Sequence, residues 1–124
     1  MSVYKQFRGV NGGASDVTSA VNIVLAAGAA RVQNVTMTVE SKSVQAPSAL
    51  NLGMGGPVYV VRNDGLLTFT FIDAAANAIA TVAPGREVSL YLLDNTTIAG
   101  TWFTESVAPN SIVSLLSQIN YGGF

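Results

Sequence analysis

The clearest pattern in this chain is a series of short apolar runs, separated by turn residues, between positions 56 and 102. The runs are rich in β-branched and aromatic side chains, and the turn sequences Asn63-Asp64-Gly65 and Pro84-Gly85 divide them. Short runs of this composition, divided by residues that favour tight turns, are typical of strands and not of helices. The pattern therefore predicts an antiparallel meander.

Alternation within the runs predicts which side chains are buried. In residues 66–72 threonines alternate with three large apolar side chains, those of Leu67, Phe69 and Phe71. A strand with one buried face and one solvated face requires this alternation. Residues 88–93 are apolar on both faces. We therefore expect a second sheet or another subunit to cover this strand on both sides.

Three upstream segments also favour extended structure. A strand is predicted from Arg31, and its buried face consists of Val35, Met37 and Val39. Residues 17–27 fit either a helix or a strand, and we favour the strand because a strand follows directly. Residues 44–52 form a shorter extended piece, in which Pro47 favours an edge or a bend.

The two ends of the chain differ from this pattern. Residues 1–16 predict an extended arm whose apolar side chains, Tyr4, Phe7 and Val10, precede a joint rich in turn residues. Large side chains on a terminal arm indicate that the arm docks on its own domain or on a neighbour. Near the C-terminus, Asn110 can cap a helix whose apolar side chains are Ile112, Leu115, Leu116 and Ile119. A helix this short needs packing partners, either its own domain or a neighbouring copy.

Together these segments predict an all-β fold, a small antiparallel β-sandwich or barrel with an extended N-terminal arm and a short C-terminal helix. We expect the arm over residues 1–16, the domain over 17–108, and the helix and tail over 109–124.

Composition indicates an assembling protein. Only 10% of the 124 residues are charged, 49% are hydrophobic, and the net charge is -1. Ordinary soluble domains have about 25% charged residues, and a net charge near zero favours association. Much of the surface is therefore expected to be buried against other copies or a larger body. The alternative is a neutral β-domain that hydroxyls and amides keep in solution.

The same composition argues against several partners and against chemistry. The six basic residues are dispersed, so we expect no nucleic acid partner. No apolar run approaches the roughly 20 residues that a membrane-spanning helix needs, and no signal peptide is visible. Without His or Cys we expect no enzyme, no metal site and no cofactor. Turn formation is the expected role of three carboxylates, those of Asp64, Asp73 and Asp94.

Three stretches resemble a small β-module of tailed-bacteriophage structural proteins. They are the sequence from Gly56 to Gly65, the sequence from Phe71 to Gly85, and Leu-Tyr-Leu-Leu-Asp-Asn-Thr-Thr-Ile-Ala-Gly-Thr-Trp102. The likeness covers about 31–103, and such modules occur in tail-fibre proteins and related virion components. A tail fibre would continue into a long shaft, whereas this chain ends at Phe124. The chain therefore looks more like a capsid decoration (cement) protein, or a short adaptor at the base of a fibre.

The resemblance implies a virion structural protein on the capsid surface, assembled in the host cytoplasm. Decoration proteins of this kind are typically trimeric, and their terminal arms clamp neighbouring capsomers. We therefore expect the major capsid protein as partner, bound across capsomer seams by Tyr4, Phe7 and Val10. Contacts between copies of a homotrimer are expected from Ile112, Leu115, Leu116 and Ile119. Two alternatives are a tail-fibre or tail-adaptor component, and a carbohydrate-binding module that uses Trp102 and Tyr91.

Overall fold

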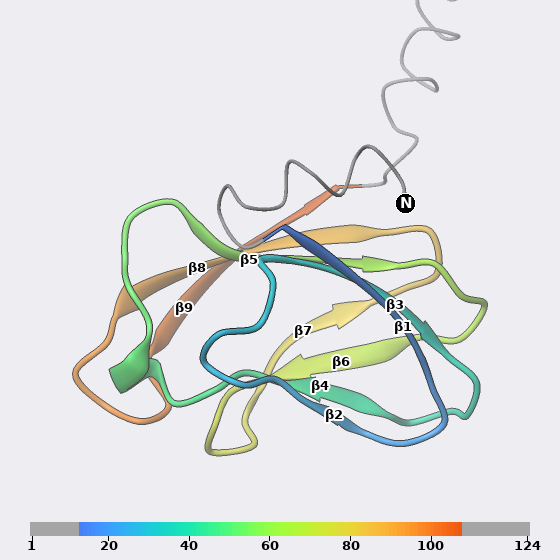
Figure 1. The fold of residues 1–124 in the computed structure, drawn as a ribbon, viewed down its shortest axis with the longest axis horizontal. Coiled ribbons are helices and arrows are strands. Elements are labelled where there is room, and N and C mark those ends of the chain that lie inside the picture. The colour runs from blue at the N-terminus through green and yellow to red at the C-terminus, as the bar shows by residue number, and fades with distance from the viewer. Residues whose placement is uncertain (1–12, 108–124) are drawn as a thin grey trace, which may run out of the picture.

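The computed structural model describes residues 13–107, which form nine strands in two mixed sheets (Figure 1). The five-stranded sheet has the order β1 (Ala14–Ser19), β3 (Val32–Met37), β5 (Pro57–Asn63), β8 (Glu87–Asp94) and β9 (Thr101–Val107). The four-stranded sheet has the order β2 (Ile23–Val24), β4 (Ser43–Gln45), β6 (Phe69–Ile72) and β7 (Ala78–Val82). A short 3₁₀ helix, η2 (Ala49–Asn51), precedes β5. The described part of the chain is thus β-rich, as predicted.

The chain passes from one sheet to the other at each of its first five connections. Because of this alternation, β1, β3 and β5 pair in parallel, and so do β2, β4 and β6. The remaining strands pair antiparallel: β7 with β6, β8 with β5, and β9 with β8. The prediction of a meander is therefore correct for the β6–β7 and β8–β9 hairpins. It is wrong for β5 and β6, and again for β7 and β8, because in each of these pairs the strands follow each other along the chain but lie in different sheets.

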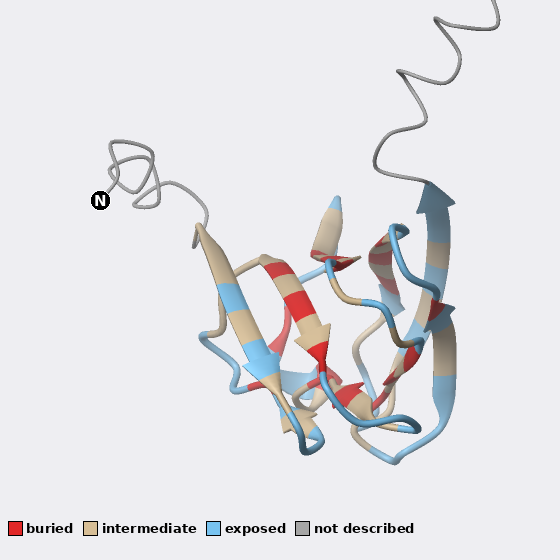
Figure 2. Cartoon of the chain, turned by 90° about the vertical axis from the view of Figure 1, so that its right-hand side faces the viewer, coloured by how far each residue is buried: buried red, intermediate tan, exposed pale blue. Residues whose placement is uncertain are grey.

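The two sheets share one apolar core. Phe71 of the four-stranded sheet lies with its ring centroid 6.1 Å from that of Tyr59 and 6.1 Å from that of Trp102, both in the five-stranded sheet. In Figure 2 the buried segments gather between the sheets. Of the core residues predicted from alternation, Val35, Met37, Phe69 and Phe71 are buried, whereas Leu67, which precedes β6, is only half-buried. One face of the two-sided apolar run is also buried: Val88, Leu90 and Leu92.

Four local predictions differ from the structure or are refined by it. Val39 is exposed because β3 ends at Met37, two residues earlier. Residues 17–27 contain parts of β1 and β2 and no helix. Because β1 begins at Ala14, the last residues assigned to the arm belong to a sheet. β4 is an inner strand, and Pro47 follows it outside any strand.

The expected cover on both faces of β8 is absent within residues 13–107. One face packs into the core, but Leu93 on the other is 59% exposed. The rest of the arm and the C-terminal helix lie outside the described residues.

Candidate interaction surfaces

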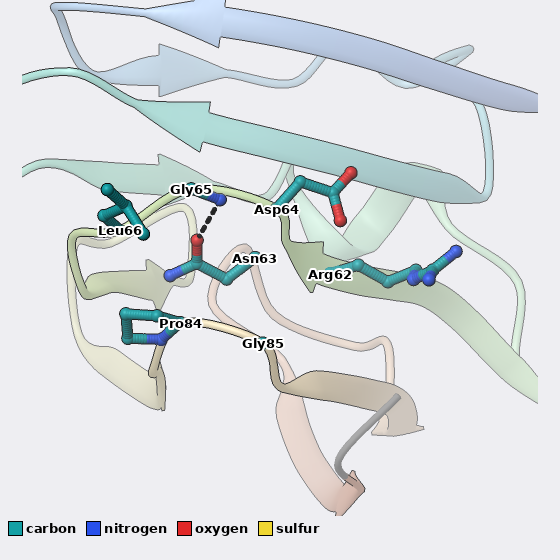
Figure 3. A pocket seen from close by; sticks show the side chains of 7 residues that line it. All are labelled: Arg62, Asn63, Asp64, Gly65, Leu66, Pro84 and Gly85. Atoms are coloured by element: carbon teal, nitrogen blue, oxygen red, sulfur yellow. Dashed lines mark hydrogen bonds between the residues drawn. The ribbon is translucent and has the colours of Figure 1, made fainter. Parts of the chain in front are cut away.

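The turn after β5 is held by the buried amide of Asn63. Its Nδ2 donates hydrogen bonds to the carbonyl oxygens of Leu67 at 2.8 Å and Val82 at 2.9 Å. Its Oδ1 accepts a hydrogen bond from the backbone N–H of Gly65 at 2.9 Å (Figure 3). This is the Asn-Asp-Gly turn that the sequence predicted, but it directs the chain into the other sheet instead of closing a hairpin. The bonds hold the loop in place, and Leu66 projects from it with 90% of its surface exposed.

Two open hollows flank Leu66. The first, about 510 Å³, lies between this loop and the β7–β8 turn, and its lining includes Arg62, Asp64 and Gly85 (Figure 3). The second, about 490 Å³, is lined by the loop, β6 and a segment that includes Glu40 and Lys42. Neither lining brings two carboxylates together with a third titratable group. Across residues 13–107 no group of three or more acidic, His or Cys side chains is placed to hold a metal ion.

The single ion pair of the described residues joins Arg62 to Glu87 on the outer face of the five-stranded sheet. Arg62 Nε lies 3.4 Å from Glu87 Oε1, without forming a hydrogen bond. Arg62 pairs in register with Glu87 on one side and with Asn34 on the other. Because both charged side chains are partly exposed, the pair contributes little to stability. It makes this part of the outer face polar.

Two of the three turn aspartates have the role that the sequence predicted. Asp73 Oδ1 accepts hydrogen bonds from the backbone N–H groups of Ala75 at 2.8 Å and Asn77 at 2.9 Å. Asp94 Oδ1 accepts from the backbone N–H of Thr96 at 3.0 Å and from its hydroxyl at 2.8 Å. These hydrogen bonds confirm turn formation for both residues. Asp64 is exposed at the corner after β5.

Trp102 and Tyr91 lie on opposite faces of the five-stranded sheet and cannot form one sugar-binding platform. In the β8–β9 register Tyr91 is opposite Phe103, and Leu92 is opposite Trp102. Side chains alternate along a strand, so Tyr91 points outward and Trp102 points toward the core. The Trp102 indole N–H donates to the carbonyl oxygen of Ala99 at 2.8 Å.

The outer face of β8 and β9 carries an apolar cluster, which we call the β8–β9 patch and define as Tyr91, Leu93 and Phe103. The rings of Tyr91 and Phe103 pack with their centroids 5.8 Å apart. Leu93 is the extra residue of a bulge, since Leu92 pairs with Trp102 and Asp94 with Thr101. Leu93 and Phe103 are 59% and 54% exposed. Exposed apolar clusters of this kind are candidate contact surfaces for a second copy or another partner.

The Tyr91 hydroxyl connects the patch to a polar neighbour. It donates a hydrogen bond to Glu105 Oε1 at 3.3 Å. Burial of the ring, the negative charge of Glu105 and this hydrogen bond together raise the pKa of Tyr91 above its usual value. The hydroxyl therefore stays protonated to higher pH than that of a free tyrosine, and its hydrogen bond links β8 to β9.

Two further exposed apolar side chains lie in the β8–β9 loop and in η2. Ile98 and Leu50 are 56% and 55% exposed. They are close to each other because the backbone N–H of Ala49 donates to the carbonyl oxygen of Ile98 at 2.8 Å. The sequence indicated that β8 is apolar on both faces. It did not indicate that Phe103 lies on the outer face, because that depends on the register of β9 with β8.

The residues expected to contact the capsid and other copies all lie outside the described range. What the structure does describe is where the two terminal segments join the domain. Residues 1–12 precede β1, and residues 108–124 follow β9. These strands are the two opposite edges of the five-stranded sheet.

Comparison with protein-family models, with curated proteins and with solved structures found no match to this chain. Within residues 13–107 no helix has the length and apolar character needed to cross a membrane.

Proposed function

We propose that this protein is a bacteriophage virion structural protein that decorates the capsid and stabilises it by binding across capsomer seams. The observation that carries the proposal is the attachment of the two terminal segments at opposite edges of one sheet, β1 and β9. Four spacings between neighbouring strands separate these edges, which is roughly 19 Å. The sheet therefore separates the N-terminal arm from the C-terminal segment, so that the two segments can contact two different partner subunits.

For the fold we propose a β-sandwich with a short helix in residues 109–124. The packing of Phe71 against Tyr59 and Trp102 supports a sandwich, because it joins the inner faces of the two sheets. The apolar spacing of Ile112, Leu115, Leu116 and Ile119 supports the helix.

The proposed mechanism is burial of apolar surface at two places. The arm, through Tyr4, Phe7 and Val10, contacts the major capsid protein, and the C-terminal segment joins copies of a homotrimer. A protein that binds the assembled capsid but not its separated subunits stabilises the assembled state by mass action. Rupture of the capsid must then also break the contacts with this protein. The proposal includes no catalytic step, metal, cofactor, nucleic acid or membrane. The protein would then be found on the capsid surface after assembly in the host cytoplasm.

The test is binding to empty heads that lack the protein. We expect deletion of residues 1–12 to abolish binding, and a triple change of Tyr4, Phe7 and Val10 to serine to weaken it strongly. The matched control is Val24→Ser, which changes an apolar side chain that is 70% exposed on the other sheet. Unchanged binding by the deleted protein would refute the role of the arm.

Labelling of the protein in intact particles separates head from tail. Label over the whole capsid surface supports decoration. Label confined to the tail, at few copies per particle, supports a tail-fibre or tail-adaptor component instead.

A further inference from the structure

We propose that the β8–β9 patch is the docking site for the C-terminal segment, residues 109–124, of a second copy of this chain. The inference deepens the proposed function and rests on it, since it names the surface that receives the contact between copies. It follows from the exposure of the patch, from the apolar pattern of the segment, and from the distance between the patch and the end of β9.

The patch has the features of a protein-docking surface. Two aromatic rings pack against each other at 5.8 Å, and Leu93 extends the apolar surface from the bulge. Aromatic side chains are enriched in interfaces because they bury a large area and lose little conformational freedom. The β8–β9 hairpin that carries the patch is continuous with the core through Leu90 and Leu92, which are buried. The patch is therefore held by the core before any partner binds.

The C-terminal segment has the complementary pattern. In a helix that begins after Asn110, its four large aliphatic side chains share one face at positions i, i+3, i+4 and i+7: Ile112, Leu115, Leu116 and Ile119. A helix this short is not stable in water without packing. An amphipathic helix on an apolar surface is a common mode of recognition between proteins. The segment therefore needs a surface of the kind that the patch offers.

The polar part of the outer face argues for a second copy as the donor of the segment. Along β9, Val107 lies four residues from Phe103, which is about 14 Å in a strand. Between these ends the outer face carries Ser89 and Glu105, and Glu87 lies opposite Val107. The apolar face of the helix, from its first to its last aliphatic side chain, is about 10 Å long. If the segment turned back directly after Val107 on its own chain, the first half of that face would lie over Ser89 and the carboxylate of Glu105.

A segment from another copy has no such restriction. It can place its aliphatic side chains over Tyr91, Leu93 and Phe103 without crossing Glu105. Exchange of the segment from each copy to the next closes a ring when the rotation between copies allows it.

Engineered disulfides test this arrangement directly, because the chain contains no Cys. One protein, with a tag that changes its size, carries Phe103→Cys, and a second, untagged protein carries Leu116→Cys. After mixing and mild oxidation we expect a disulfide-linked product of mixed size. The matched control replaces the first variant by Val24→Cys, whose side chain is exposed on the other sheet. The control should give no mixed product.

The other outcomes overturn the proposal. A product that contains two copies of Phe103→Cys would mean that the patches face each other. With both substitutions in one chain, a disulfide formed only within single chains would mean that the segment covers its own patch. The absence of any mixed product would mean that the segment docks elsewhere.

Self-association provides a second measurement. We expect Phe103→Glu and Leu116→Glu each to weaken it roughly tenfold or more in sedimentation experiments, since both place a charge in the contact. Val24→Glu should leave it unchanged. Binding to empty heads is measured separately, so the docking proposal and the capsid proposal can fail independently. Mixed disulfides without head binding would support the docking site and refute the capsid role. Head binding without mixed disulfides would support the capsid role and refute the docking site.

Discussion

Asn63 Nδ2 donates a hydrogen bond to the carbonyl oxygen of Val82 at 2.9 Å, and this bond joins the end of β5 in one sheet to the end of β7 in the other. The same side chain fixes the turn that transfers the chain between the sheets. A short side chain therefore stabilises both a local turn and the packing of two layers. Its removal should affect the whole domain.

We expect Asn63→Ala to lower the free energy of unfolding by about 2 kcal/mol, because it leaves two buried carbonyl oxygens without their donor. Urea unfolding measures the change. Asn51→Ala serves as the control, since Asn51 is exposed in η2. Equal effects of the two substitutions would mean that the Asn63 hydrogen bonds are not needed for stability.

Gly100 lies where no larger residue fits. A Cβ atom there would lie 2.6 Å from Ala49 Cβ and 2.8 Å from Leu92 Cδ1, and its φ is +72°. We expect Gly100→Ala to cost about 2–4 kcal/mol, from overpacking and from the left-handed backbone together. Gly85 has a similar φ of +76° and no neighbouring atom within 4 Å. Gly85→Ala should therefore cost only about 1–2 kcal/mol, and thermal unfolding of both variants measures the packing contribution as the difference.

Substitution by alanine should lower stability greatly at one phenylalanine and very little at another. Phe71 is fully buried between two aromatic rings, so Phe71→Ala should cost about 3–5 kcal/mol. Phe103 is 54% exposed, and Phe103→Ala should change the stability of the isolated domain by no more than about 0.5 kcal/mol. Unfolding should be followed at a concentration where the protein is monomeric. A large loss at Phe103 would show that its ring supports the fold and not an interface.

Burial raises the pKa of Tyr59 above its ordinary value of 10.0. In the unfolded chain the phenol ionises near that value, whereas in the folded protein it stays protonated to higher pH. The contribution of Tyr59 is therefore fully present below pH 10.0 and is lost as the pH rises toward the folded pKa. We expect Tyr59→Phe to reduce this alkaline loss, seen in urea unfolding between neutral pH and about pH 11. An identical alkaline profile for the variant and the natural protein would contradict the prediction.

Local patterns in the sequence predicted much of the β-structure and the roles of several turn residues. Alternation identified Val35, Met37, Phe69 and Phe71 as core residues because side chains of a strand point to opposite faces in turn. Asp73 and Asp94 were correctly assigned to turns because a short carboxylate bonds the backbone nearby. Each of these inferences depends on neighbours within a few residues along the chain.

The interaction surface was predicted only in part. The apolar second face of β8 was visible in the sequence, and in the structure Leu93 on this face is exposed. The position of Phe103 on the outer face was not visible in the sequence. It follows from the register of β8 and β9, in which Tyr91 pairs with Phe103 and Leu92 pairs with Trp102. The same register separates Trp102 from Tyr91.

The sequence by itself therefore determined which segments are extended, which faces are buried and where the chain turns, because those properties depend on local side-chain chemistry. Only the tertiary structure decided which strands are neighbours. The apolar runs predict strands at β5 and β6 but do not state whether these strands pair with each other or lie in opposite sheets. That choice depends on contacts between distant segments, such as Asn63 with Val82 and Phe71 with Tyr59. It also places the two edges, β1 and β9, where the terminal segments begin.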